Sequence, residues 1–211
     1  MAICKNAEFT MVGTGPLLFG KAVFEEKRDD ESHAQFDERT WQQKCTTDND
    51  GRLAISGTAV HRCLVAGGSW LKMKFKGTAT FGKRFESGVF PVEPFFPIEV
   101  NGYSATTGDT EGSRVYATCT PEHCEKYPLF VPVGGDKRGT SRVWRIFPRL
   151  KPGWRCRASI LVTDEQITAK VFEKHIRAAG LHDGMGAMRI GRGGPNGMFT
   201  VEEFKMTDAE F

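Results

Sequence analysis

Alternating apolar and polar positions predict strands at both ends of the chain. Trp154 to Val162 (WRCRASILV) alternates and then becomes fully apolar, which is typical of a central strand. Leu71 to Lys76 alternates most regularly, with lysines on one face. Shorter patterns of the same kind predict strands at 8–12, 17–24, 53–55, 95–100, 115–118, 142–147 and 198–201.

A 3.6-residue apolar period predicts two helices between these strands. In Thr163 to Gly180, Thr163 and Gln166 have the spacing of a capping box, and Gly180 stands where a terminal glycine belongs. Ala59 to Ala66 is a second predicted helix, and Gly67-Gly68 is expected to end it. Strands and helices in this mixture indicate an α+β fold.

Residues 184–197 form a glycine-rich loop that carries Arg189 and Arg192 and no acidic residue. Glycines let a backbone approach a ligand closely, successive N–H groups can point at one oxyanion, and arginine side chains bind phosphate through two hydrogen bonds. A helix precedes the loop and a strand follows it, so the loop matches neither a Walker nor a Rossmann motif. A surface hairpin without a ligand is the alternative.

The same region resembles a known family. A helix ending in Ala-Ala-Gly, then Gly-x-Gly-x-x-Arg, a glycine-rich turn and Gly-x-Phe-x-Val resemble the signature of the RAMP superfamily, the ferredoxin-like RNA-binding proteins of CRISPR systems. The clear match covers residues 154–204. The N-terminal half matches only loosely, at Pro16-Leu17-Leu18 and at the 54–60 segment. Virus-borne proteins of unassigned role are also similar.

The resemblance implies a ferredoxin-like core of the RNA-recognition-motif type. It also implies that the loop lies against a nucleic-acid backbone. By position, the residues that inherit this role are Arg189, Gly191, Arg192, Gly193 and Gly194.

We expect the chain to divide into three parts. Residues 1–85 form the first part of the core, with an acidic, exposed arm at 25–50. Residues 86–135 are interrupted by prolines and form an irregular, β-rich, acidic insertion; in the resembled family such an insertion is thumb-like and contacts a neighbouring subunit. Residues 136–211 complete the core and carry the glycine-rich loop.

Charge is segregated along the chain although the net charge is only +3. Residues 52–85 and 137–157 contain basic residues and no acidic ones, whereas 86–125 is mostly acidic. Separate basic and acidic surfaces indicate a polyanionic partner for the basic surface. The acidic surface is expected to contact a protein partner or a second copy of this chain.

Two basic strands supply the other candidate contacts. Lys72, Lys74 and Lys76 are expected on one face about 7 Å apart, close to the spacing of phosphates, although lysines also protect edge strands. Arg142 and Arg145 flank Trp144, which could stack on a base. At least one of Trp144 and Trp154 is expected to fill the core.

Two constellations could carry chemistry. Cys119 and Cys124 could bind zinc together with His61 and Cys63, but the spacing is loose and we assign no metal ligand. His61 or His182 could act as a general base towards an RNA 2′-hydroxyl, as in RNA-cleaving members of the resembled family. No supporting motif accompanies either histidine, and we assign no catalytic residue and no cofactor.

The sequence therefore predicts a protein that binds single-stranded nucleic acid, RNA before DNA, largely through phosphates and with several copies along one strand. The alternatives are a metal-independent endoribonuclease and a viral structural or interaction protein that binds no nucleic acid. We expect no membrane segment and no signal peptide, and we therefore expect a cytoplasmic location.

Overall fold

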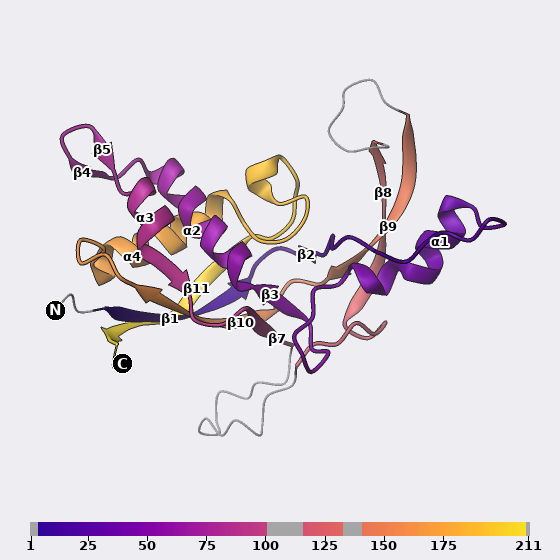
Figure 1. Ribbon diagram of the computed structural model, residues 1–211, viewed down its shortest axis with the longest axis horizontal. Helices are drawn as coiled ribbons and strands as arrows, with labels where there is room; N and C mark the ends of the chain where they lie inside the picture. The colour runs from indigo at the N-terminus through magenta and orange to yellow at the C-terminus, as the bar shows by residue number, and fades with distance from the viewer. Residues whose placement is uncertain (1–3, 101–115, 133–140, 210–211) are drawn as a thin grey trace.

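In the computed structural model, which describes residues 4–100, 116–132 and 141–209, helices cover one side of a twisted sheet and a long hairpin projects at one end (Figure 1). The helices are α1 (His33–Thr40), α2 (Gly57–Leu71), α3 (Gly82–Gly88) and α4 (Ala169–His182), with short 3-10 turns η1 (Trp41–Lys44) and η3 (Ile190–Arg192). The strands are β1 (Lys5–Gly13), β2 (Leu17–Leu18), β3 (Ala54–Ser56), β4 (Lys74–Lys76), β5 (Ala79–Thr80), β6 (Val89–Pro91), β7 (Phe95–Glu99), β8 (Cys124–Pro132), β9 (Arg142–Leu150), β10 (Arg155–Val162) and β11 (Phe199–Asp208).

The main sheet is antiparallel, in the order β11-β1-β10-β7-β3, and β6 also pairs with β10. Alternation along β1 places Ala7, Phe9 and Met11 against the helices, where they are buried. Strands β6 and β7 lie within the predicted insertion, and both belong to the main sheet. The three-part division of the chain stays a prediction.

Helix α4 packs on this sheet, but it is displaced from its predicted bounds. It begins after Thr168, whose side chain accepts the Val171 N–H, so Thr163 is not its cap. It continues through Gly180, where a Cβ would lie 2.3 Å from the Phe199 carbonyl oxygen. Gly180 is thus a contact between helix and strand, and the prediction that it ends the helix is wrong.

Helix α2 likewise runs through its paired glycines. A Cβ at Gly67 would lie 2.6 Å from the His175 carbonyl oxygen, so this glycine lets α2 approach α4 closely. The helix ends only at Leu71, and Lys72 then adopts a left-handed conformation with φ 46°. The strand predicted at 71–76 is therefore limited to β4. Within the described residues, no helix has the length and apolar character of a membrane span.

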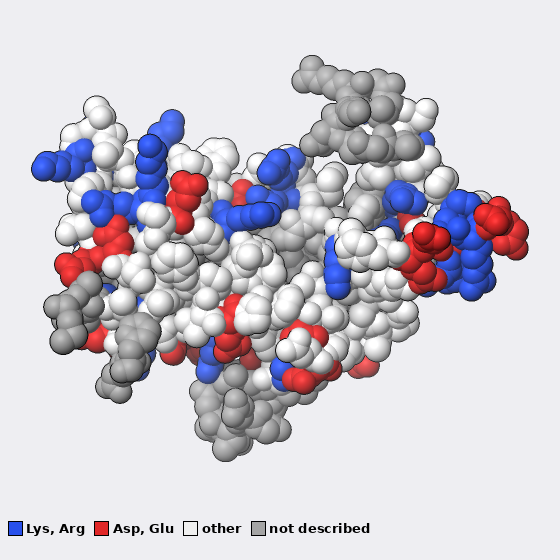
Figure 2. All heavy atoms as spheres, in the orientation of Figure 1, with Lys and Arg blue, Asp and Glu red and all other residues white. Residues whose placement is uncertain are grey.

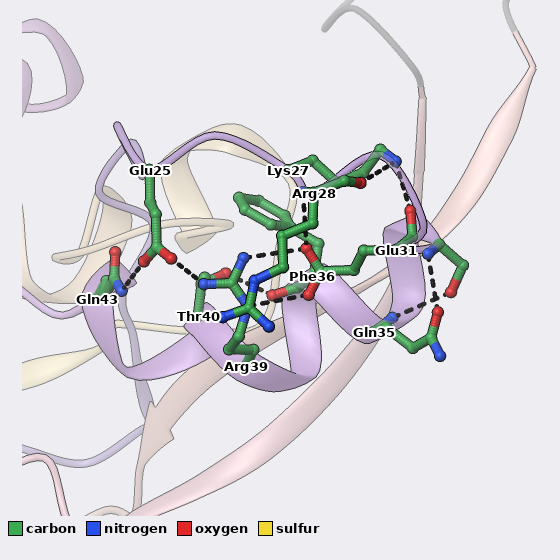
Figure 3. Close-up of polar contacts among 10 residues, drawn as sticks. Glu25, Lys27, Arg28, Glu31, Gln35, Phe36, Arg39, Thr40 and Gln43 are labelled. Atoms are coloured by element: carbon green, nitrogen blue, oxygen red, sulfur yellow. Dashed lines mark hydrogen bonds and ion pairs between the residues drawn. The ribbon is translucent and has the colours of Figure 1, made fainter.

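The second sheet, β2-β9-β8, forms the projecting hairpin, and the predicted acidic arm packs against it. Asp37 of α1 is fully buried and pairs with Lys44 and Arg145. Figure 3 shows that Arg39 of α1 forms ion pairs with Glu25 and Glu31, which link the segment before α1 to the helix. Most of residues 25–38 are exposed, as expected, but Asp37 is buried and supplies the carboxylate that compensates Arg145.

Candidate nucleic-acid interface

A groove of about 500 Å³ lies between the start of α2, the segment after β2 and the glycine-rich loop. We call it the basic groove because Lys21, Arg62 and Arg189 line it and no Asp or Glu does. The remaining wall is mostly apolar or backbone, including Gly184 and Gly186. Figure 2 shows Lys and Arg side chains over the middle of the molecule, where Figure 1 places α2 and the loop.

Two of the three cations in this groove are uncompensated. Lys21 and Arg62 are exposed, and neither forms an ion pair with any described residue. Arg189 instead donates from Nε to Asp183 Oδ2 at 3.0 Å, and Asp183 is buried. Lys21 and Arg62 were absent from the predicted site, because nothing in the sequence brings either residue near the loop.

The loop amides are already used within the protein. The N–H groups of Gly191, Arg192, Gly193 and Gly194 donate to the carbonyls of Asp183, Arg189, Ile190 and Arg189 in turn, at 2.9–3.1 Å. The expectation that these amides converge on an oxyanion is therefore wrong. A phosphate contact by the loop would come from its side chains, and the exposed Arg192 is free of ion pairs with described residues.

The glycines allow the loop to pack on itself. A Cβ at Gly194 would lie 1.9 Å from the Met188 carbonyl oxygen, and one at Gly197 would lie 1.9 Å from that of Met185. Gly193, with φ +77°, has nothing within 4 Å of its Cβ position. Packing thus explains Gly194 and Gly197, and Gly193 is the position that leaves room for a ligand.

The loop is tied to the segment around β2, which fixes the shape of the groove. Ala187 N–H donates to Leu18 O at 2.8 Å, and Gly197 N–H donates to Pro16 O at 2.7 Å. Opposite the loop, Ser56 caps α2 by accepting the Ala59 N–H. The positive end of the α2 dipole therefore lies at the groove and adds to its attraction for anions.

The other predicted contacts lie away from the groove. The β4–β5 hairpin and the β8–β9 hairpin stand at opposite ends of the long axis, with the glycine-rich loop between them (Figure 1). Lys72, Lys74 and Lys76 are exposed and have no ion pairs with described residues. They lie towards one end of the long axis, away from the loop.

The β8–β9 hairpin carries predicted residues of different character. Trp144 is 62% exposed, and its ring centroid lies 5.4 Å from that of Phe130. Arg142 is exposed beside it, whereas Arg145 pairs with buried Asp37. Trp154 is buried and donates to Gly15 O at 3.0 Å, so it is the tryptophan that fills the core.

The sheet face away from the helices differs from the stacking surface of an RNA recognition motif. Such a motif presents aromatic side chains on its sheet. Here the outward side chains of the three adjacent strands β11, β1 and β10 include none; they are Asn6, Glu8, Thr10, Val12, Arg155, Arg157, Ser159, Leu161, Thr200, Glu202, Glu203, Lys205 and Thr207. The exposed aromatic side chain on this face is Phe90 of β6, which pairs with Leu161 and is 47% exposed. This face is mixed in charge and carries several ion pairs.

The histidines considered for catalysis lie apart. His61 Nε2 is 3.2 Å from Phe85 O on the far side of α2 from the groove lining, and His182 stacks on Trp70 at 5.4 Å. Cys63 donates to Gly184 O, so it does not join His61, Cys119 and Cys124 as the sequence suggested.

Cys119 and Cys124 meet Cys45 instead, and the three sulfurs lie within 4.8 Å of one another. Hydrogen bonds with Cys124 and Cys45 lower the pKa of the Cys119 thiol to about 4. The same contact with Cys119 raises the pKa of Cys124 to about 12. Cys45 was missed because 74 residues separate it from Cys119 in the sequence.

Neither a protein-family model nor a curated protein matches this chain. Among solved structures, a chain from the cryo-EM structure of the Type III-B Cmr-beta bound to cognate target RNA is similar, with a TM-score of 0.52 and 9% identity. Cmr6 from Pyrococcus furiosus gives a TM-score of 0.48 and 11% identity over 96% of this chain and 100% of its own. The first match covers 98% of this chain and 61% of the length of the other. It shows a RAMP-like fold, a mixed α/β arrangement with antiparallel sheets, as the sequence resemblance led us to expect.

Proposed function

We propose that this protein binds single-stranded RNA in the basic groove, mainly through phosphates and without cleaving it. The observation that carries the proposal is the pair of exposed cations, Lys21 and Arg62, which have no ion-pair partner among the described residues and lie in a groove whose described lining contains no carboxylate. A polyanion gains most where cations have no partner within the protein, because it does not have to displace one.

The walls of the groove suit a backbone better than base edges. The start of α2 contributes the positive end of its dipole, and Arg192 stands on the adjoining loop. The uncharged polar side chains that line the groove and could contact a base edge are Ser56, Thr58 and Thr46. Binding of this kind depends on charge and has little sequence preference.

The fold supports RNA as the first ligand to test. The order β11-β1-β10-β7, with α2 following β1 and α4 following β10, is the strand order of a ferredoxin-like core, and we assign the core to that class. A similarly folded chain comes from a structure that contains bound target RNA. Single-stranded DNA offers the same phosphates and is the matched comparison.

The projecting hairpins extend the proposal beyond the groove. Trp144 and Phe130 form an exposed aromatic pair next to Arg142, which is the combination that stacks on bases and holds phosphates. Lys72, Lys74 and Lys76 lie at the other end of the long axis. A strand that follows the basic groove would leave it towards one of these hairpins, so several copies could bind one RNA.

The test is a titration of labelled single-stranded RNA and DNA of equal length against the double variant Lys21→Ala, Arg62→Ala at two salt concentrations. Exposed charge pairs contribute about 0.5–1 kcal/mol each, so we expect about tenfold weaker RNA binding in the variant. The slope of log affinity against log salt concentration should become shallower by about 1.4, since each lost contact with a single strand contributes about 0.7.

The matched control is Lys170→Ala, Lys174→Ala, which removes the same charge from exposed positions of α4 that do not line the groove. It should retain wild-type affinity within about twofold if the groove, and not the net charge, is responsible. Equal losses in both variants would refute the groove. The same reactions run on a gel detect cleavage, and products that disappear in His61→Ala or His182→Ala would establish the endoribonuclease alternative.

A further inference from the structure

Three cysteine side chains meet at the base of the β8–β9 hairpin. Cys45 follows η1, Cys119 lies in the turn before β8, and Cys124 begins β8. Their Sγ atoms all lie within 4.8 Å of one another, and those of Cys45 and Cys119 are 2.7 Å apart. None of the three thiols contributes to the basic groove.

Local structure explains how the thiols converge. The His123 and Cys124 N–H groups both donate to Thr120 O, at 3.1 and 2.8 Å, which folds 119–124 into a tight turn with both sulfurs on one side. Gln42 Nε2 donates to Cys119 O at 3.0 Å and holds this turn against η1. Cys45 and Cys124 are buried, and Cys119 is partly exposed. The cluster is therefore closed by protein on most sides and open to solvent at Cys119.

The geometry points to a metal: we propose that Cys45, Cys119 and Cys124 bind one Zn²⁺ ion as thiolates. Thiolate sulfur is the preferred ligand of structural zinc, and Zn–S bonds of about 2.3 Å place tetrahedral sulfurs about 3.8 Å apart. Sulfurs within 4.8 Å of one another can reach such an ion once Cys45 and Cys119 separate by about 1 Å. The three thiols release three protons when the ion binds.

The fourth ligand would come from outside the cysteine cluster. No other His, Cys, Asp or Glu in the described part of the chain joins the three sulfurs. Three protein ligands with water in the fourth position is a known zinc arrangement, and the partly exposed side at Cys119 gives water access. His123 is not available in its present position, because its Nδ1 accepts the Thr118 N–H at 3.1 Å.

The competing outcome for these thiols is a disulfide between Cys45 and Cys119. The 2.7 Å separation lies between a bond length of about 2.05 Å and the spacing expected around zinc. A disulfide would use two of the sulfurs and leave Cys124, which is buried against them, without a role. Zinc uses all three, and it would join the residue after η1 to the turn before β8, where Cys119 lies 74 residues after Cys45.

The test is elemental analysis of the full chain, purified after expression in zinc-supplemented medium, together with the variants Cys119→Ser and Cys45→Ser. We expect one zinc per chain in the wild type and less than a tenth of that in either variant. Cys63→Ala and Cys156→Ala are matched controls, because both remove buried cysteines outside the cluster, and they should keep the full zinc content.

A second measurement on the wild type keeps the proposal testable if a variant fails to fold. Adding Co²⁺ to metal-free protein should produce the intense near-ultraviolet absorption of a thiolate–cobalt bond, and zinc should remove it. The proposal is overturned if the wild type contains no zinc and all six cysteines react with a thiol reagent after denaturation. It is equally overturned if a peptide linking Cys45 to Cys119 appears in non-reducing mass spectrometry of freshly isolated protein.

Discussion

Two hollows among the described residues are similar in size and opposite in electrostatic character. The basic groove, of about 500 Å³, has Lys21 and Arg62 unpaired and no carboxylate in its lining. The second, of about 630 Å³, lies beside β7 and the open sheet face, and we call it the acidic hollow because carboxylates outnumber cations there. Its charged lining residues are Glu8, Asp48, Asp50, Arg52, Glu93, Glu99 and Arg157.

The arginines of the acidic hollow are compensated locally. Arg52 pairs with Asp48 at 2.6 Å and with Asp50 at 2.8 Å, and the hydrogen bond to Asp48 raises the pKa of Arg52. The cations of the basic groove lack such partners, with the exception of Arg189. Under the proposed function, local pairing of cations, and not the net charge of +3, decides where RNA binds.

The largest expected effect comes from Gly197→Ala, which would displace Met185, a residue that lines the basic groove. The new Cβ would lie 1.9 Å from the Met185 carbonyl oxygen at a φ of +81°, so we expect a loss of about 3 kcal/mol or more in the free energy of unfolding. RNA binding should fall with it, while the acidic hollow, which this loop does not line, stays intact. Urea denaturation and RNA titration measure the two effects.

Gly193→Ala is the matched variant in the same loop. It has nearly the same φ, +77°, but nothing within 4 Å of the Cβ, so only the backbone strain of about 1–2 kcal/mol applies. Equal destabilisation by the two variants would mean that backbone conformation alone, and not close packing, requires the glycines.

An intermediate effect is expected from pH, because His175 of α4 is buried against α3 and the later part of α2. The side chain is fully buried, and burial lowers its pKa. The unfolded chain therefore takes up a proton, near its ordinary pKa of about 6.5, that the folded chain does not. Stability should be full above this pH and fall as pH drops below it, by at most about 1.4 kcal/mol per pH unit.

Thermal denaturation between pH 8 and pH 5 measures this dependence, and His175→Phe should make the profile flatter. RNA affinity of the folded protein should change little over the same range, because Lys and Arg stay charged throughout. Affinity that follows the stability profile would show that the groove is not independent of the helix layer.

The smallest expected effect is that of neutralising the acidic hollow. Glu8→Gln with Glu93→Gln should change RNA affinity by less than about twofold, since surface charges beyond a Debye length of about 10 Å are screened. The titration used for the basic groove measures it. A tenfold gain would show that repulsion by these carboxylates governs binding, and a tenfold loss would show that the carboxylates themselves contact the RNA.

Local patterns in the sequence predicted some strands well, but the strand predicted at 17–24 is limited to β2, that at 71–76 is limited to β4, and β8 was not predicted. The alternation at 154–162 corresponds to β10, and those at 8–12 and 142–147 lie within β1 and β9. Helix bounds were less accurate, because glycine has two uses that look alike in a sequence. Gly67 and Gly180 appear as helix ends, but each allows close contact with an element distant in the chain. Only the position of that element distinguishes the two uses.

The site was less predictable than the fold because its residues come from separate segments. Arg189 and Arg192 were found through the loop composition, but Lys21 and Arg62 have no motif around them. Arg145 appeared uncompensated because its partner, Asp37, lies 108 residues earlier in a helix that was expected to be an exposed arm. Charge patterns along a sequence therefore indicate a basic surface without showing which cations are free.

The occupied amides of the glycine-rich loop have a consequence for how its specificity could change. Since the N–H groups of residues 191–194 already have acceptors, the backbone there has little conformational entropy left to lose when a ligand arrives. The free energy of each contact then depends on the side chains at 189, 192 and their neighbours. If the loop contacts RNA as proposed, substitutions at those positions would change its preferences without changing the loop conformation, because the hydrogen bonds that hold the loop come from its backbone.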